Sequence, residues 1–205
     1  MKTMLVLSFA ALAVIPGVRA ADAVKPPCCA SCATGGEAAA PFTARSLYQS
    51  EGKWTNDRGE AFTLATLRGR PVVLAMFFAN CTYACPMLVS DMQRLRASLP
   101  ADARAKAQFV LVSFDVARDT PAALKAYRER MGLEADTWTL LHGDAAAVQE
   151  LAMLLGVKYK QDAQGQFSHS NLITVLNAEG EVAHQRAGLS GDVTEAAKAV
   201  ALASK

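Results

Sequence analysis

The chain has 205 residues, of which 52% are hydrophobic and 20% charged, with 21 basic residues against 19 acidic ones. These are the proportions of an ordinary globular protein, so a mostly disordered chain is excluded. A net charge of +2 is too small for a surface that neutralises many phosphates, so nucleic acid is not expected as a partner.

The first twenty residues have the three-part pattern of a secretory signal peptide. Lys2 supplies a positive start, residues 4–15 form an apolar run, and Val18-Arg19-Ala20 offers a cleavage site. The run is shorter than the roughly 20 residues that span a bilayer; an uncleaved amphipathic anchor is the alternative. The sequence therefore predicts an exported, periplasmic protein that is cleaved after Ala20 and keeps no stable membrane span.

Residues 21–45 are predicted to form a flexible tether, because prolines, glycines and alanines leave no periodic apolar face. This segment contains three of the five cysteines, namely Cys28, Cys29 and Cys32. They could bind Cu(I) and pass metal or disulfides to a second site. The alternative is a mobile tail whose thiols oxidise without consequence.

A folded domain is expected over residues 46–205, where strands and helices alternate. Apolar and β-branched runs predict strands at 72–78, 108–114, 138–141, 171–176 and 181–186. Helical spacing and end signals predict helices at 87–99, 119–131, 144–155 and 191–203. This order predicts a three-layer α/β/α sandwich with a mixed central sheet, the thioredoxin-like architecture.

The segment Asn80-Cys81-Thr82-Tyr83-Ala84-Cys85-Pro86 follows the first buried strand and opens the next helix. The carboxyl end of a strand is the usual place for a site in an open α/β sheet. The partial positive charge of a helix N-terminus favours thiolates, so both cysteines are expected to be reactive. Their spacing allows either a disulfide or the binding of one soft metal ion.

His169 is the candidate third ligand. It precedes the strand 171–176, in a loop that presents a proline to the cysteine pair in thioredoxin-type redox proteins. Two thiolates and an imidazole suit Cu(I), whereas zinc usually takes a fourth ligand. The alternatives are a plain redox pair at Cys81 and Cys85 and an ordinary polar loop residue at position 169.

Other candidate residues are assigned structural roles. Asp115 could orient a metal ligand, but a cap or turn formed together with Asp119 is favoured. His142 lies near a strand end and could approach the site, but a role in the turn before the next helix is favoured. His184 is expected to lie inside a strand.

The chain resembles the SCO/SenC family, the copper chaperones of cytochrome c oxidase assembly, over about residues 46–203. The resemblance is carried by the strand leading into Cys81-Thr-Tyr-Ala-Cys85-Pro86, by Val112–Pro121, and by His169 with the following strand. It implies that Cys81, Cys85 and His169 bind copper. It also implies delivery to the dinuclear copper centre of oxidase subunit II, or reduction of that subunit's cysteines. The family usually has proline directly after the first cysteine, and Thr82 in its place is expected to change the rigidity of the loop.

Two enzymatic functions are the alternatives. A periplasmic thiol–disulfide oxidoreductase would use Cys81 and Cys85 without metal, whereas a thiol peroxidase is disfavoured because neither cysteine lies in a peroxidase signature. The fold alone does not separate these functions from metal transfer. Histidine rather than proline at position 169 favours copper.

Overall fold

The computed structural model describes residues 40–205. The expected signal peptide and most of the expected tether, with Cys28, Cys29 and Cys32, lie outside the described residues.

The last residues of the expected tether contact the folded unit, which extends over Ala40–Lys205. The ring of Phe42 packs edge-on against Tyr48, with ring centres 6.3 Å apart, and the Arg68 guanidinium lies 4.8 Å from the centre of the Phe42 ring. Residues 40–45 therefore belong to the same packed body as the sheet.

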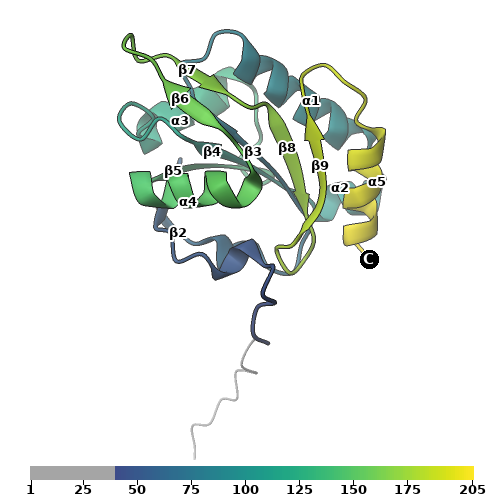
Figure 1. The fold of residues 1–205 in the computed structure, drawn as a ribbon. Coiled ribbons are helices and arrows are strands. Elements are labelled where there is room, and N and C mark those ends of the chain that lie inside the picture. Colours follow the sequence, from purple (N-terminus) through teal and green to yellow (C-terminus); the bar gives the residue numbers. More distant parts are fainter. Residues whose placement is uncertain (1–39) are drawn as a thin grey trace, which may run out of the picture. The chain divides into compact units, whose positions relative to one another are not determined.

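A seven-stranded mixed sheet forms the centre of this body, in the order β2-β1-β5-β4-β3-β8-β9 (Figure 1). Its strands are β1 (Trp54–Asn56), β2 (Ala61–Phe62), β3 (Val72–Phe77), β4 (Gln108–Ser113), β5 (Trp138–Gly143), β8 (Leu172–Leu176) and β9 (Val182–Ala187). Strands β3, β4 and β5 are parallel, and the remaining pairs are antiparallel. Two further strands, β6 (Tyr159–Gln161) and β7 (Phe167–His169), pair with each other as a separate hairpin.

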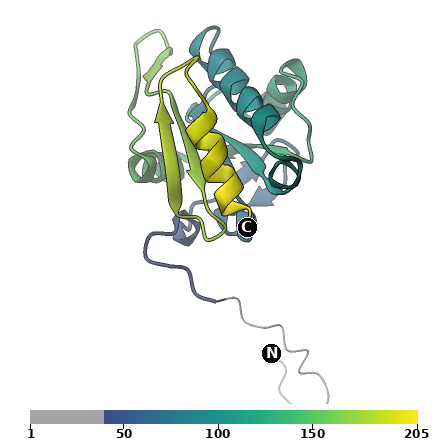
Figure 2. The same cartoon turned by 90° about the vertical axis from the view of Figure 1, so that its right-hand side faces the viewer.

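Helices cover both faces of the sheet. One face carries α1 (Ala84–Ser98), α3 (Pro121–Arg130) and α5 (Thr194–Ala203), and the other carries α4 (Ala145–Leu155) (Figures 1 and 2). The short helices are α2 (Ala101–Lys106) and the 3-10 turns η1 (Leu47–Gln49) and η2 (Leu64–Leu67). This is the three-layer thioredoxin-like sandwich that the sequence predicts.

The pairing of β3 determines where the site lies. All six residues of β3 are buried, as expected for a parallel strand covered on both faces. It runs parallel to β4 and in register with it, so the segments that follow these two strands meet at one edge of the sheet. Strand β8 is antiparallel to β3, so the residues that enter β8 reach the same edge.

End signals in the sequence place two helices near that edge. Thr120 caps α3 by accepting the N–H of Ala123 at 3.3 Å, and Pro121 follows it in the first turn. Asp144 caps α4 by accepting the N–H of Ala147 at 2.8 Å. Both helices therefore begin where the sequence predicts.

The structure corrects the expectation for one histidine. Strand β5 continues to Gly143, so His142 lies inside a strand, opposite Thr55 of β1, and does not support a turn. β1 supplies the partner that extends β5, and a strand of three residues is too short to show a period in the sequence. His184 lies inside β9, as predicted.

Within residues 40–205, none of the helices combines the length and apolar character needed to cross a membrane.

Candidate metal site

Cys81 and Cys85 lie where β3 leads into α1. Cys81 is in the connecting loop, and Cys85 is the second residue of the helix. The N–H of Cys85 donates to Sγ of Cys81 at 3.3 Å. The Cys85 side chain is completely buried and Cys81 is partly exposed, and both are free thiols. Cys81 is therefore the thiol of this pair that a partner can reach.

His169 completes the group from the opposite side. It is the last residue of β7, paired with Tyr159 of β6, so the expected loop position is in fact the end of a strand. Its Nε2 lies 3.6 Å from Sγ of Cys85, and its Nδ1 lies 3.0 Å from the carbonyl oxygen of Ser170. Because a carbonyl only accepts, Nδ1 donates to it, and the lone pair on Nε2 is directed towards Cys85.

The three ligand atoms can surround one ion. The ligand atoms of Cys81, Cys85 and His169 all lie within 4.8 Å of one another. Bonds of about 2.0 Å to nitrogen and about 2.3 Å to sulfur place the ligands of a three-coordinate ion about 3.5–4 Å apart. Small side-chain movements are thus enough to bring the three ligand atoms around one ion. Two thiolates with one imidazole are soft donors suited to Cu(I). Neither His142 nor His184 belongs to this group in the described part of the chain.

The electrostatics of the buried thiol differ from the sequence expectation. Burial raises the pKa of the Cys85 thiol well above its usual range, because a thiolate there loses its hydration. The helix N-terminus does not make Cys85 an activated thiolate, so the expectation of high reactivity is wrong for this residue. Burial also lowers the pKa of His169, which keeps the imidazole neutral. A bound cation would compensate for the negative charge of the Cys85 thiolate, which burial disfavours.

Aromatic rings hold the imidazole of His169. The Phe114 ring centre lies 5.0 Å from it, and the Phe78 ring stands at 88° to it at 6.0 Å. Phe114 in turn stacks on Tyr159 at 5.2 Å. These rings come from three different parts of the chain, so no local sequence pattern reveals them. They restrict the orientation of the ring and shield it from water.

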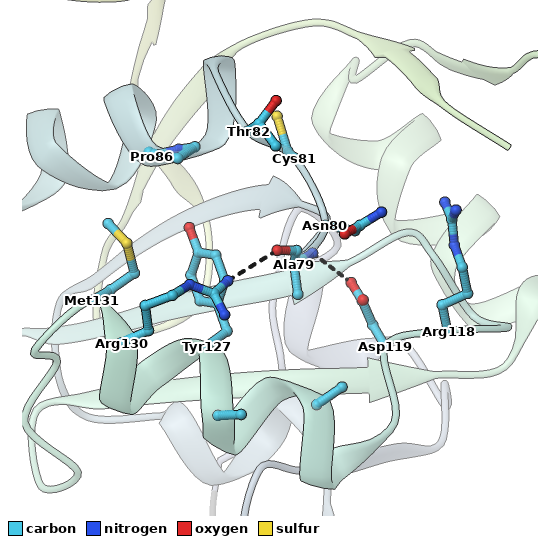
Figure 3. Close-up of a pocket in the computed structure, with 12 residues that line it drawn as sticks. Ala79, Asn80, Cys81, Thr82, Pro86, Arg118, Asp119, Tyr127, Arg130 and Met131 are labelled. Carbon is cyan, nitrogen blue, oxygen red and sulfur yellow. Dashed lines mark hydrogen bonds between the residues drawn. The ribbon is translucent and has the colours of Figure 1, made fainter. Parts of the chain in front are cut away.

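Two side chains hold the loop that carries Cys81 (Figure 3). The Asp119 carboxylate accepts the N–H of Ala79 at 2.8 Å and the hydroxyl of Ser113 at 2.5 Å. The carbonyl of Ala79 accepts from the Arg130 guanidinium at 3.2 Å. The peptide groups on both sides of Ala79 are therefore held, two residues before Cys81. These contacts restrain a loop in which Thr82 gives less rigidity than proline.

The two aspartates before α3 have different roles. Asp115 accepts the N–H of Arg118 at 3.2 Å and pairs with its guanidinium, which is the predicted turn role. Asp119 does not take part in a cap, because Thr120 caps the helix. Asp119 is a site residue that sequence reasoning missed, since its partner Ala79 lies 40 residues away.

The fold and the site geometry together define a class of protein, namely a thioredoxin-like protein with a soft-metal site at the edge of its sheet. The chain matches the SCO1/SenC family model over residues 43–203. It is 34% identical over 155 residues to a Stutzerimonas stutzeri protein named as copper-binding, which covers 72% of each chain. It is 25% identical over 130 residues to the SCO1 protein homolog of Bacillus subtilis, over 62% of this chain and 67% of that one. The chain belongs to the SCO1/SenC family.

Solved structures show the same fold. ScoI of Bradyrhizobium japonicum with copper bound matches with a TM-score of 0.59 at 24% identity, over 73% of this chain and 94% of that one. A SCO1/SenC family lipoprotein of Bacillus anthracis matches with a TM-score of 0.68 at 22% identity, over 75% of this chain and 92% of that one. The thioredoxin-like prediction is confirmed. Copper, the predicted cofactor, agrees with these relatives and with the donor set of the Cys81–Cys85–His169 group.

Proposed function

We propose that the protein is a copper chaperone whose Cys81, Cys85 and His169 bind one Cu(I) ion. The observation that carries the proposal is the 3.6 Å approach of His169 Nε2 to Sγ of the buried Cys85. With Nδ1 donating to a carbonyl, Nε2 is free to be a ligand. A thiol as buried as Cys85 is poorly placed to meet a protein disulfide, whereas a small ion can reach it past Cys81.

We propose that the copper goes to the dinuclear centre of cytochrome c oxidase subunit II, or that the protein prepares the cysteines of that centre. Membership in the SCO1/SenC family supports this class of recipient. The signal-peptide pattern of residues 1–20 supports export to the periplasm as the place of transfer.

A metal-free thiol–disulfide oxidoreductase is the second candidate. The observation in its favour is the accessible Cys81 beside a second free thiol, with Sγ accepting the Cys85 N–H at 3.3 Å. In that reaction the Cys81 thiolate attacks the partner's disulfide, and Cys85 then displaces the partner to form the Cys81–Cys85 disulfide. The two functions can coexist, because cysteines must be reduced before they receive copper.

The experiment is a transfer assay with the soluble copper domain of subunit II, in two arms. One arm mixes the copper-loaded protein with the reduced recipient and measures the copper in each protein after separation. The other mixes the reduced, copper-free protein with the oxidised recipient and measures the recipient's free thiols. Each arm is run with the wild type, His169→Ala and, as a matched control outside the group, His184→Ala.

Copper movement in the first arm that is lost in His169→Ala and kept in His184→Ala is the expected result. Absence of copper movement, together with recipient thiols that appear equally in all three proteins, would replace the chaperone proposal by the oxidoreductase.

A further inference from the structure

The β6–β7 hairpin, which supplies His169, has few polar contacts with the rest of the protein. Its strands pair only with each other and form no ladder with the seven-stranded sheet. Apart from the approach of His169 to Cys85, one hydrogen bond reaches residues 158–170 from elsewhere in the described chain. In this bond Arg118 donates to the carbonyl of Gly165, in the turn of the hairpin. Because an isolated two-stranded hairpin is marginally stable in water, such outside contacts determine how firmly this one is held.

A buried carboxylate anchors Arg118 on its other side. Nε of Arg118 lies 2.5 Å from Oδ2 of Asp115, whose side chain is 1% exposed. The N–H of Asp115 donates to the hydroxyl of Ser113, the last residue of β4, at 3.0 Å. The Arg118 side chain points away from α3 (Figure 3). Because a guanidinium presents its donors in fixed directions, this one group bridges the end of β4 and the turn of the hairpin.

The same guanidinium contacts the aromatic rings beside the imidazole. It lies 5.9 Å from the centre of the Phe167 ring. Phe167 packs against Phe78 at 5.2 Å and against Phe114 at 4.9 Å, and these are the two rings that hold the His169 imidazole. Phe167 and His169 are two residues apart in β7, so they lie on the same face of the hairpin. A displaced turn would therefore disturb the packing of both side chains.

The position of the hairpin decides whether the three ligand atoms can meet. Both cysteines belong to the loop and helix that follow β3, whereas His169 comes from the hairpin alone. Nε2 of His169 lies 3.6 Å from Sγ of Cys85. This distance falls within the roughly 3.5–4 Å that separates the ligands of a three-coordinate ion, and an outward movement of the hairpin by about 1 Å takes the imidazole out of that range.

We propose that Arg118 is a positioning residue for the metal site. By bridging Asp115 and the Gly165 carbonyl, it holds the β6–β7 hairpin at the distance where His169 reaches Cys85. Arg118 acts through His169 and is not itself a ligand. The proposal rests on the proposed function in that it needs His169 to be a copper ligand.

The first measurement is amide hydrogen exchange of the reduced, copper-free full chain. We expect Arg118→Ala to speed exchange in the β6–β7 hairpin about tenfold, because a hydrogen bond from a charged donor is lost, and to leave β9 unchanged. Arg94→Ala is the matched control. Arg94 also pairs at 2.5 Å with a buried aspartate three residues earlier, Asp91, and also donates to a backbone carbonyl, that of Gly191. Arg94→Ala should leave exchange in the hairpin unchanged.

The second measurement is a competition for Cu(I) against a calibrated chelator, in chains with serine in place of Cys28, Cys29 and Cys32. Arg118→Ala should weaken the affinity for Cu(I) about tenfold when His169 is present. In a His169→Ala background the same substitution should change the affinity less than about twofold, because no imidazole remains to be positioned. Arg94→Ala should leave the affinity unchanged in both backgrounds.

Hairpin exchange in Arg118→Ala that is no faster than in Arg94→Ala would overturn the proposal. A loss of Cu(I) affinity of the same size with and without His169 would also overturn it, because Arg118 would then act on the site as a whole. Failure of the proposed function gives a different result, namely no tight Cu(I) binding in the parent chain or equal affinities in the parent and in His169→Ala. Hydrogen exchange of the hairpin does not depend on copper and reports on the bridge in either case.

Discussion

Asp119→Ala is the substitution whose effect follows most directly from the geometry beside Cys81. Asp119 is 2% exposed, and its carboxylate is the acceptor for the Ala79 N–H and the Ser113 hydroxyl. Alanine leaves both donors without a partner in a place that water reaches poorly. At about 1–3 kcal/mol for each of the two buried unsatisfied groups, we expect the free energy of unfolding to fall by about 2–6 kcal/mol.

The assay is urea unfolding of the reduced, copper-free chain, with Asp119→Asn as the matched control. Asparagine keeps an acceptor oxygen, so the free energy of unfolding of Asp119→Asn should lie within about 1 kcal/mol of the wild-type value. The alanine variant should also bind Cu(I) about 10- to 100-fold more weakly, because the loop carrying Cys81 loses one of the two side chains that hold it. An alanine variant as stable as the asparagine one would refute the assigned role of Asp119.

Three further predictions concern stability, each measured by urea unfolding. Burial holds the pKa of the Cys85 thiol above its ordinary 9.0, so the copper-free protein should lose stability as the pH rises past about 9, where the unfolded chain releases this proton and the folded chain keeps it. Cys85→Ser should lack the part of this pH dependence that comes from the Cys85 thiol. A pH dependence of stability identical to that of the wild type would contradict the raised pKa of Cys85. Arg128→Ala strands the buried carboxylate of Asp57, paired at 2.5 Å, and should cost about 3–5 kcal/mol; a cost below about 1 kcal/mol would show the pair to be dispensable. Gly143→Ala brings a Cβ to 2.5 Å from the Trp54 ring and should cost about 1–3 kcal/mol, a prediction that an unchanged midpoint would refute.

The alternation of strands and helices could be predicted because its signals are local. Strand β3 is a continuous apolar run, and the caps at Thr120 and Asp144 lie beside the helices they begin. The two- and three-residue strands β2 and β1 could not be predicted, because they are strands only through their pairing with each other and with β5. The same pairing decides that His142 lies in a strand.

The candidate ligands could also be found from the sequence, because Cys81 and Cys85 mark a strand–helix junction and His169 lies where a chain enters the neighbouring strand. The environment of these ligands could not be predicted from the sequence. Complete burial determines the raised pKa of Cys85, and contact across 40 residues determines the role of Asp119. Both depend on packing between distant segments, which no spacing of residue types records.

A competitive titration of the reduced chain with Cu(I) against a calibrated chelator tests the central claim most directly. It compares His169→Ala with His142→Ala, a matched control outside the ligand group, each in a chain with Cys28, Cys29 and Cys32 replaced by serine. The account predicts one tightly bound Cu(I) per chain in the parent and in His142→Ala, and an affinity at least about 100-fold lower in His169→Ala. Equal affinities in all three proteins, or no tight binding in the parent, would contradict it.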